Sequence, residues 1–209
     1  MRFRQKTIEQ LQANYGSHRE LAQKLLTDAD NPIGAWQFSD EDEAILGTVA
    51  HSWLQMMGVD QLIGWDEQRL LLGEPLMRHQ LISAGYSEDS LGTALAELQQ
   101  QLLNSLHNPE LRVVLINPKA HHEWPLHDMD GKLLIMDLVV PYEDHWHVID
   151  FKSSRRWQDE SAEDYQVRMR QEYLPQLRNY CAYLQAIDGR SAKASLFLME
   201  EGIFVEVIS

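Results

Sequence analysis

Two aspartates lie inside segments that are otherwise apolar. Asp137 falls in Leu133–Val140, and Asp150 falls in Val148–Lys152. Aspartate is a poor strand former, and an ionised carboxylate is costly to bury unless it is paired or bound to a cation. If a hairpin brings the two side by side, their charges repel, and a hard divalent cation relieves that repulsion. The pair therefore predicts a divalent-metal site.

A lysine lies next to this predicted site. Lys152 follows Asp150 by two positions, so strand alternation puts both side chains on one face. An ammonium there can orient or help deprotonate an attacking water and neutralise charge that develops on a phosphate. The alternative for Asp150 and Lys152 alone is an ordinary ion pair at a strand end. Once Asp137 is included, the set favours catalysis.

The first half of the chain carries helical periodicity. A turn at residues 31–34 precedes Ser39 and four acidic residues, which is the pattern of a helix cap and an acidic first turn. Residues 87–90 open a second helix, whose leucines recur at helical spacing from Leu91 to Leu106. Asn108 and Pro109 end it.

The second half carries strand periodicity. We expect a short β-branched strand at 111–116, and a hairpin of 132–140 with 145–151 through the turn at 141–144. A helix that breaks near Pro175 follows, and strands at 195–199 and 203–208 close the chain. Helices, a core of antiparallel strands, then a helix and two strands predict an α/β domain.

The charge is strongly negative and uneven. The 209 residues carry a net charge of −14, and residues 25–149 hold 20 of the 32 acidic residues but only 5 of the 18 basic ones. Such a balance argues against simple nonspecific nucleic-acid binding. Residues 150–195 are close to balanced, with 8 basic and 7 acidic residues. Residues 150–195 are therefore where phosphate binding is expected, and another protein or domain is expected to supply much of the contact with DNA.

The cysteine count and the hydropathy exclude several kinds of site and a membrane span. Cys181 is the single cysteine, which excludes an internal disulfide, a cysteine-based zinc site and an iron–sulfur cluster held within this chain. This usage fits the cytoplasm. No segment approaches the ~18 apolar residues that a membrane span requires, so we expect no membrane association.

Five segments, in order, resemble the PD-(D/E)XK nuclease superfamily, and within it the RecB/AddA-type exonuclease domain found at the C-terminus of recombination helicases. The resemblance covers roughly Trp36 to the C-terminus. It implies a restriction-endonuclease-like core, with a central mixed sheet flanked by helices, in a domain of residues 36–209 preceded by a helical extension of residues 1–35. The matching segments are Leu46–Leu54, His122–Leu126, Ile135–Asp137, Val148–Ser153 and Tyr173–Tyr180.

The resemblance also implies a role for each matching residue. His51, Asp137, Asp150 and the backbone carbonyl of Phe151 are expected to bind Mg²⁺, for which Mn²⁺ can substitute, and Lys152 is expected to act on the attacking water. The remaining roles that the resemblance implies are DNA binding or support of the site, assigned to Gln176, Tyr180 and Glu123. Apart from the resemblance, Arg155 and Arg156 follow Lys152 closely enough for phosphate contact, and the alternative for them is a solvated turn.

Three features bear on alternatives. The family often has glycine where Leu134 stands, which affects packing but removes no catalytic group. The histidine pairs at 121–122 and at 145 and 147 could suggest zinc, but no compact third ligand follows them. The chain has no phosphate-binding loop of the GxxxxGK[ST] type, so we expect no ATP motor within it, and it is either a stand-alone nuclease or the tail of a larger helicase. A helicase partner is what the family resemblance implies. A nuclease-like interaction module without activity, and a metal-dependent hydrolase acting on something other than DNA, remain open.

Overall fold

The structure, a computed structural model, describes residues 41–127 and 133–209, which belong to one compact unit. The predicted extension at residues 1–35 and the predicted cap at Ser39 lie outside the described residues. The described elements are α2 (Glu41–Val59), α3 (Glu67–Leu72), α4 (Glu74–Ser83), α5 (Leu91–His107), α6 (Pro109–Leu115), β1 (His121–His127), β2 (Leu133–Pro141), β3 (His145–Lys152), α7 (Ala162–Asp188), β4 (Ser191–Leu198) and β5 (Ile203–Ile208).

The five described strands form one open mixed sheet in the order β1-β2-β3-β4-β5. Neighbouring strands are antiparallel except for β3 and β4, which are parallel. The predicted α/β class and the predicted hairpin of β2 with β3 are confirmed. The expected mixed sheet is also confirmed: β3 and β4 are parallel because the helix α7 connects them, and a long crossover returns the chain in the same direction.

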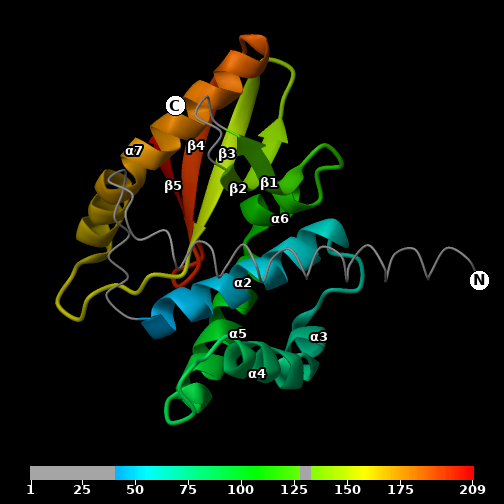
Figure 1. The fold of residues 1–209 in the computed structure, drawn as a ribbon, viewed down its shortest axis with the longest axis vertical. Helices are drawn as coiled ribbons and strands as arrows, with labels where there is room; N and C mark the ends of the chain where they lie inside the picture. The colour runs from blue at the N-terminus through cyan, green and yellow to red at the C-terminus, as the bar shows by residue number, and fades with distance from the viewer. Residues whose placement is uncertain (1–40, 128–132) are drawn as a thin grey trace, which may run out of the picture. The chain divides into compact units, whose positions relative to one another are not determined.

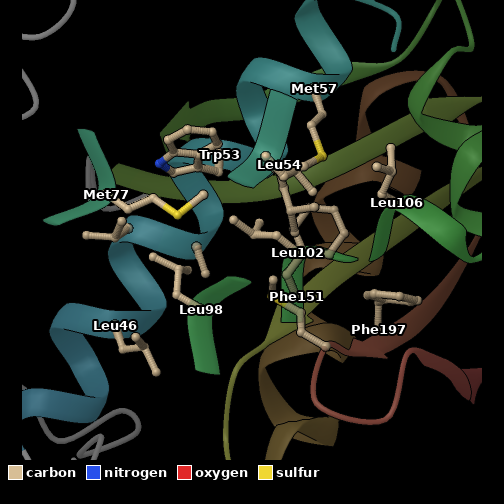
Figure 2. Close-up of a cluster of buried hydrophobic side chains, with 14 of the residues drawn as sticks. Leu46, Trp53, Leu54, Met57, Met77, Leu98, Leu102, Leu106, Phe151 and Phe197 are labelled. Carbon is tan, nitrogen blue, oxygen red and sulfur yellow. The ribbon is translucent and has the colours of Figure 1, made fainter. Parts of the chain in front are cut away.

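Helices cover both faces of this sheet. Figure 1 shows α7, in orange, along one face, while α2, α5 and α6 gather on the other side. Figure 2 shows the core on the α2 side, in which Leu54 of α2 and Leu102 of α5 pack with Phe151 of β3. Each fully buried side chain of this size contributes about 1.5–3 kcal/mol relative to exposure. This packing fixes α2 against the strand that carries Asp150 and Lys152.

The segment 111–116 is helical, so the predicted strand there is wrong. α6 begins at Pro109, a residue that suits the first helical turn. The Asn108 side chain accepts a hydrogen bond from the Leu111 amide, which caps the helix. Leu111, Val114 and Leu115 are buried at the i, i+3, i+4 spacing of one helical face. The capping and the burial together outweigh the strand preference of the β-branched residues.

The predicted break near Pro175 is also wrong, because α7 runs through it as one helix of 27 residues. A proline inside a helix costs about 3 kcal/mol. Pro175 itself is exposed, whereas Tyr173 and Leu177 on either side of it are buried against the sheet. Burial on both sides of the proline holds the helix together.

None of the helices in the described part of the chain combines the length and the apolar character that crossing a membrane requires.

Candidate metal and phosphoryl-transfer site

Strand β2 becomes irregular at Asp137. Met136 packs into the core on the α7 side and Leu138 into the core on the α2 side, although residues two apart in a regular strand share a face. The ladder with β3 is regular from Leu138–Ile149 onwards. Beyond it, Oδ2 of Asp137 accepts the Phe151 amide at 2.7 Å. The aspartate thus lies where β2 and β3 separate.

Strand β1 adds a third carboxylate at the same level. Glu123 has a φ of 48°, which is in the left-handed region that costs a non-glycine residue energy and is common at functional sites. It falls between His122 and Trp124, which pair with Leu138 and Met136. Its carboxylate thereby approaches Asp137 rather than solvent.

Helix α2 brings His51 to this point from the other side. Its Nε2 donates to the Phe151 carbonyl at 3.0 Å, and its Nδ1 lies 3.4 Å from Oδ1 of Asp137. Among the described residues, one group could hold a metal ion: a donor atom from each of His51, Glu123 and Asp137, all within 4.8 Å of one another.

Asp150 and Lys152 form the adjoining half of the site. Nζ of Lys152 lies 2.6 Å from Oδ2 of Asp150, and both side chains are at most 10% exposed. The same ammonium lies 4.0 Å from the ring centre of Tyr173 in α7. Asp150 is thus held to the lysine and is not one of the three donors grouped around His51.

Helix α7 closes the site over these strands. The Gln176 amide donates to Tyr180 Oη at 2.7 Å and, more distantly, lies 3.5 Å from Oδ1 of Asp150. The Tyr180 hydroxyl donates to the Ile135 carbonyl at 3.1 Å. These two residues, one helical turn apart, therefore connect α7 to β2 and β3, the strands that carry Asp137 and Asp150.

We call Glu123, Asp137 and Asp150 the acidic cluster, and its carboxylates perturb one another. Burial, and then the Asp137 charge, raise the pKa of Glu123 to about 7. Burial also raises the pKa of Asp150 against the opposing effect of Lys152. Burial would raise the pKa of Asp137 as well, but His51, Lys152 and the Phe151 amide together lower that pKa. Perturbed carboxyls in a cluster of this kind are typical of functional sites.

The two basic groups respond to this cluster. Burial opposes the charge on His51, but the charge and hydrogen bond of Asp137, together with the Glu123 charge, raise the His51 pKa to about 9. Burial likewise opposes the Lys152 charge, but Asp150, Tyr173 and Asp137 together raise the pKa of Lys152. Both groups are therefore cationic at neutral pH in the metal-free chain.

The structure brings together eight of the residues singled out from the sequence, counting the Phe151 carbonyl, and leaves two to one side. Arg155 is paired with Glu97 of α5 through both carboxylate oxygens, with Nε at 2.8 Å from Oε1. Arg156 lies 3.3 Å from Glu201 in the β4–β5 turn. The eight that converge are His51, Glu123, Asp137, Asp150, Phe151, Lys152, Gln176 and Tyr180.

The remaining histidine pairs have other partners. His147 shares a hydrogen bond of 2.9 Å with Ser195, and His145 lies 2.7 Å from Asp144. His121 stacks on Trp124. None of these histidines belongs to a metal-binding group within the part of the chain that the structure describes.

Sequence reasoning gave no role to two residues that contact the segment around Lys152. Tyr173 lies beneath the ammonium, and the buried Gln101 of α5 donates to the Ser153 carbonyl at 3.2 Å. Tyr173 shares a helical face with Gln176 and Tyr180, which was a usable signal. Gln101 offered none, because it lies among leucines of a helix whose packing partner the sequence does not specify.

In comparisons with protein-family models and with curated protein sequences, nothing matches this chain.

Proposed function

We propose that this chain is a metal-dependent nuclease of the PD-(D/E)XK type that hydrolyses phosphodiester bonds in DNA. The observation that carries the proposal is the meeting of His51, Asp137 and the Asp150–Lys152 pair, from three separate elements, where β2 and β3 separate. A five-stranded mixed sheet with helices on both faces supports a restriction-endonuclease-like fold.

The donor chemistry suits a hard divalent ion. Carboxylate oxygens and one imidazole nitrogen converge within 4.8 Å, and such donors bind Mg²⁺ or Mn²⁺. The raised pKa of Glu123, about 7, follows from burial and from the neighbouring Asp137 charge, and a bound cation would relieve that crowding. The choice of magnesium, with manganese as a substitute, comes from the family resemblance.

The chain's own groups fit a hydrolytic role. A bound divalent ion would stabilise charge on the phosphate and favour ionisation of water. The donor group of His51, Glu123 and Asp137 would hold that ion, and the family resemblance adds Asp150 and the Phe151 carbonyl as ligands. Nζ of Lys152, fixed 2.6 Å from Asp150, would orient the attacking water and neutralise charge on the phosphate oxygens. Gln176 and Tyr180 would line the DNA side of the site.

The wider setting belongs to the same proposal. We infer an exonuclease that processes DNA ends in recombination or repair in the cytoplasm, together with a helicase subunit or domain. The net charge of −14 supports dependence on a partner, and so does the pairing of Arg155 and Arg156 with glutamates, because these two arginines are the ones expected to contact phosphate.

The same charge observation favours a second candidate, a nuclease-like interaction module without catalytic activity. In that case the pairing of Lys152 with Asp150 would be purely structural. The two candidates differ in whether the acidic cluster binds a metal ion and whether DNA is cut.

Cleavage of end-labelled linear DNA and of circular DNA, single- and double-stranded, in Mg²⁺ or Mn²⁺ tests the proposal. We expect linear DNA to be shortened from its ends, and we expect Asp137→Ala to remove both this activity and the calorimetric signal of metal binding. Asp144→Ala, an exposed acid of the β2–β3 turn, is the matched control. Metal binding without cleavage by the chain, alone and with an added helicase, would favour the interaction module; unchanged metal binding in Asp137→Ala would overturn the site.

A further inference from the structure

The face of α7 that covers the site contains three residues in register. Tyr173, Gln176 and Tyr180 recur at the i, i+3, i+7 spacing of one helical face. Gln176 and Tyr180 reach Asp150 and Ile135. Tyr173 instead reaches Lys152, with 4.0 Å between Nζ and the ring centre. The proposed function gives Tyr173 no role through this contact.

The ammonium of Lys152 is held between two groups. Oδ2 of Asp150 lies 2.6 Å from it, and the Tyr173 ring faces it. The lysine backbone is fixed as well, because its carbonyl accepts the Met199 amide at 2.9 Å. A cation on an aromatic face gains more when both groups are desolvated, and here Lys152 is 9% exposed and Tyr173 7% exposed.

An ion pair alone does not fix a lysine in this way. A carboxylate attracts an ammonium from many directions, and four rotatable bonds leave the lysine several ways to reach it. A ring below the ammonium excludes the conformers in which Nζ would occupy the space of the ring. The side chain of Lys152 is therefore held toward Asp150.

We propose that Tyr173 is a positioning residue for the reaction: its ring holds the Lys152 ammonium beside Asp150 and directed at the site of water attack. This inference rests on the proposed nuclease function for its kinetic consequence, but its geometric content stands apart from activity. The ring is the active element, so phenylalanine substitutes for tyrosine and leucine does not.

The geometric content is tested first by NMR on protein with ¹³C-labelled lysine. The chain has six lysines, and Lys152→Arg identifies the signal of interest. We expect its ε-methylene protons to be shifted upfield by the ring current in the wild type and in Tyr173→Phe, and to return to the range of ordinary lysines in Tyr173→Leu. An unshifted Lys152 signal in the wild type would overturn the proposal.

The kinetic content is tested with the same variants on DNA at saturating Mn²⁺. We expect Tyr173→Leu to lower kcat about 10-fold, the scale of one desolvated cation–π contact, with KM and metal affinity unchanged. Tyr173→Phe should remain close to wild type. Leu184→Ala, which removes a fully buried side chain about three turns further along α7, controls for loss of stability and should leave kcat unchanged.

The outcomes separate the two proposals. Equal loss of kcat in Tyr173→Leu and Leu184→Ala, or equal loss in Tyr173→Phe and Tyr173→Leu, would reduce Tyr173 to a packing or hydroxyl role. If the lysine signal is shifted upfield but the chain cuts no DNA, alone or with a helicase, the nuclease function is contradicted. The contact between the ring and the lysine would then be structural only, and Tyr173 would have no positioning role in a reaction.

Discussion

Both ends of strand β3 carry charged and aromatic side chains, but the carboxylates at the two ends have different partners. At the hairpin end, Asp188 binds Arg190 at 2.6 Å and accepts the Trp146 indole N–H, while Asp144 lies beside His145. At the site end, the acidic cluster has three carboxylates next to Lys152 and His51.

The carboxyl pKa values express this difference. Hydrogen bonding to Arg190 lowers the pKa of Asp188 to about 2, and His145 lowers that of Asp144. Burial raises the pKa of Glu123 to about 7 and also raises that of Asp150. Acids at the hairpin end are therefore stabilised as anions, whereas two at the site end are penalised. Local pairing of charges is what a structural role needs, and an unrelieved excess of buried acid is what a cation site needs.

The largest expected effect is on activity at the site end. Asp150→Asn keeps the shape of the side chain but removes a charge that would hold the metal ion and Lys152, so we expect cleavage to fall by at least about 1,000-fold. The far-UV circular dichroism should stay that of the wild type. If a folded Asp150→Asn protein cut DNA at the wild-type rate, the site end of β3 would have no catalytic role that the hairpin end lacks.

The second effect is a gain of stability from removing a crowded acid. Glu123 has a pKa of about 7 in the folded chain against an ordinary value of 4.5, so the folded state binds more protons between these pH values. The unfolding free energy therefore falls as pH rises through this window. Without metal at pH 8, we expect Glu123→Gln to raise the unfolding free energy by about 2–3 kcal/mol.

Urea unfolding in EDTA measures this gain. The difference between Glu123→Gln and wild type should shrink as the pH is lowered from 8 toward 4.5, where the glutamate is protonated in the folded state and half protonated in the unfolded state. A glutamine variant that is less stable than wild type at pH 8 would show that Glu123 is stabilised by its surroundings.

The third effect has the opposite pH dependence and lies at the hairpin end. Burial lowers the pKa of His147 from 6.5 to about 4, with smaller contributions of the same sign from His145 and Lys193 and an opposing one from Glu206. The unfolded state binds more protons between pH 4 and 6.5, so stability falls as pH drops through this range. As the pH drops to 4.5, we expect His147→Gln to lose about 1–2 kcal/mol less unfolding free energy than the wild type.

Unfolding free energies of His147→Gln and wild type at pH 7.5, 6, 5 and 4.5 provide the measurement. Parallel curves for the two proteins would mean that His147 is accessible enough to be protonated normally.

The smallest expected effect is on activity at the hairpin end. Asp188→Asn weakens the pairing with Arg190 in a region that contributes nothing to the acidic cluster. We expect rates of DNA cleavage and the calorimetric metal affinity to match wild type. A loss comparable to that of Asp150→Asn would mean that the two ends of β3 act as one site.

Much of this arrangement was predictable from the residues. The β2–β3 hairpin follows from two β-branched runs around a turn, and the convergence of Asp137 with Asp150 follows from that hairpin. The family resemblance placed His51 with them, and the structure puts its ring against Asp137. The hairpin is set by neighbours in sequence, which is why the residues predict it. The contact of His51 with Asp137 joins distant segments and was expected only from the family resemblance.

Other features depend on contacts distant in sequence. Asn108 caps α6 from within its own segment, but the burial of α6 and the burial on both sides of Pro175 in α7 come from packing against distant segments. The neutralisation of Arg155 by Glu97 joins residues 58 positions apart. Sequence periodicity carries no information about such a pairing, so the expected phosphate contact could not be weighed against it.

The central claim is that the acidic cluster holds a divalent ion beside Lys152. Anomalous X-ray diffraction from a crystal grown in abundant Mn²⁺ tests it most directly. We expect one strong anomalous peak contacted by oxygens of Asp137 and Asp150 and a nitrogen of His51, with the lysine ammonium adjacent. Well-ordered aspartates in that crystal without an anomalous peak between them would contradict it.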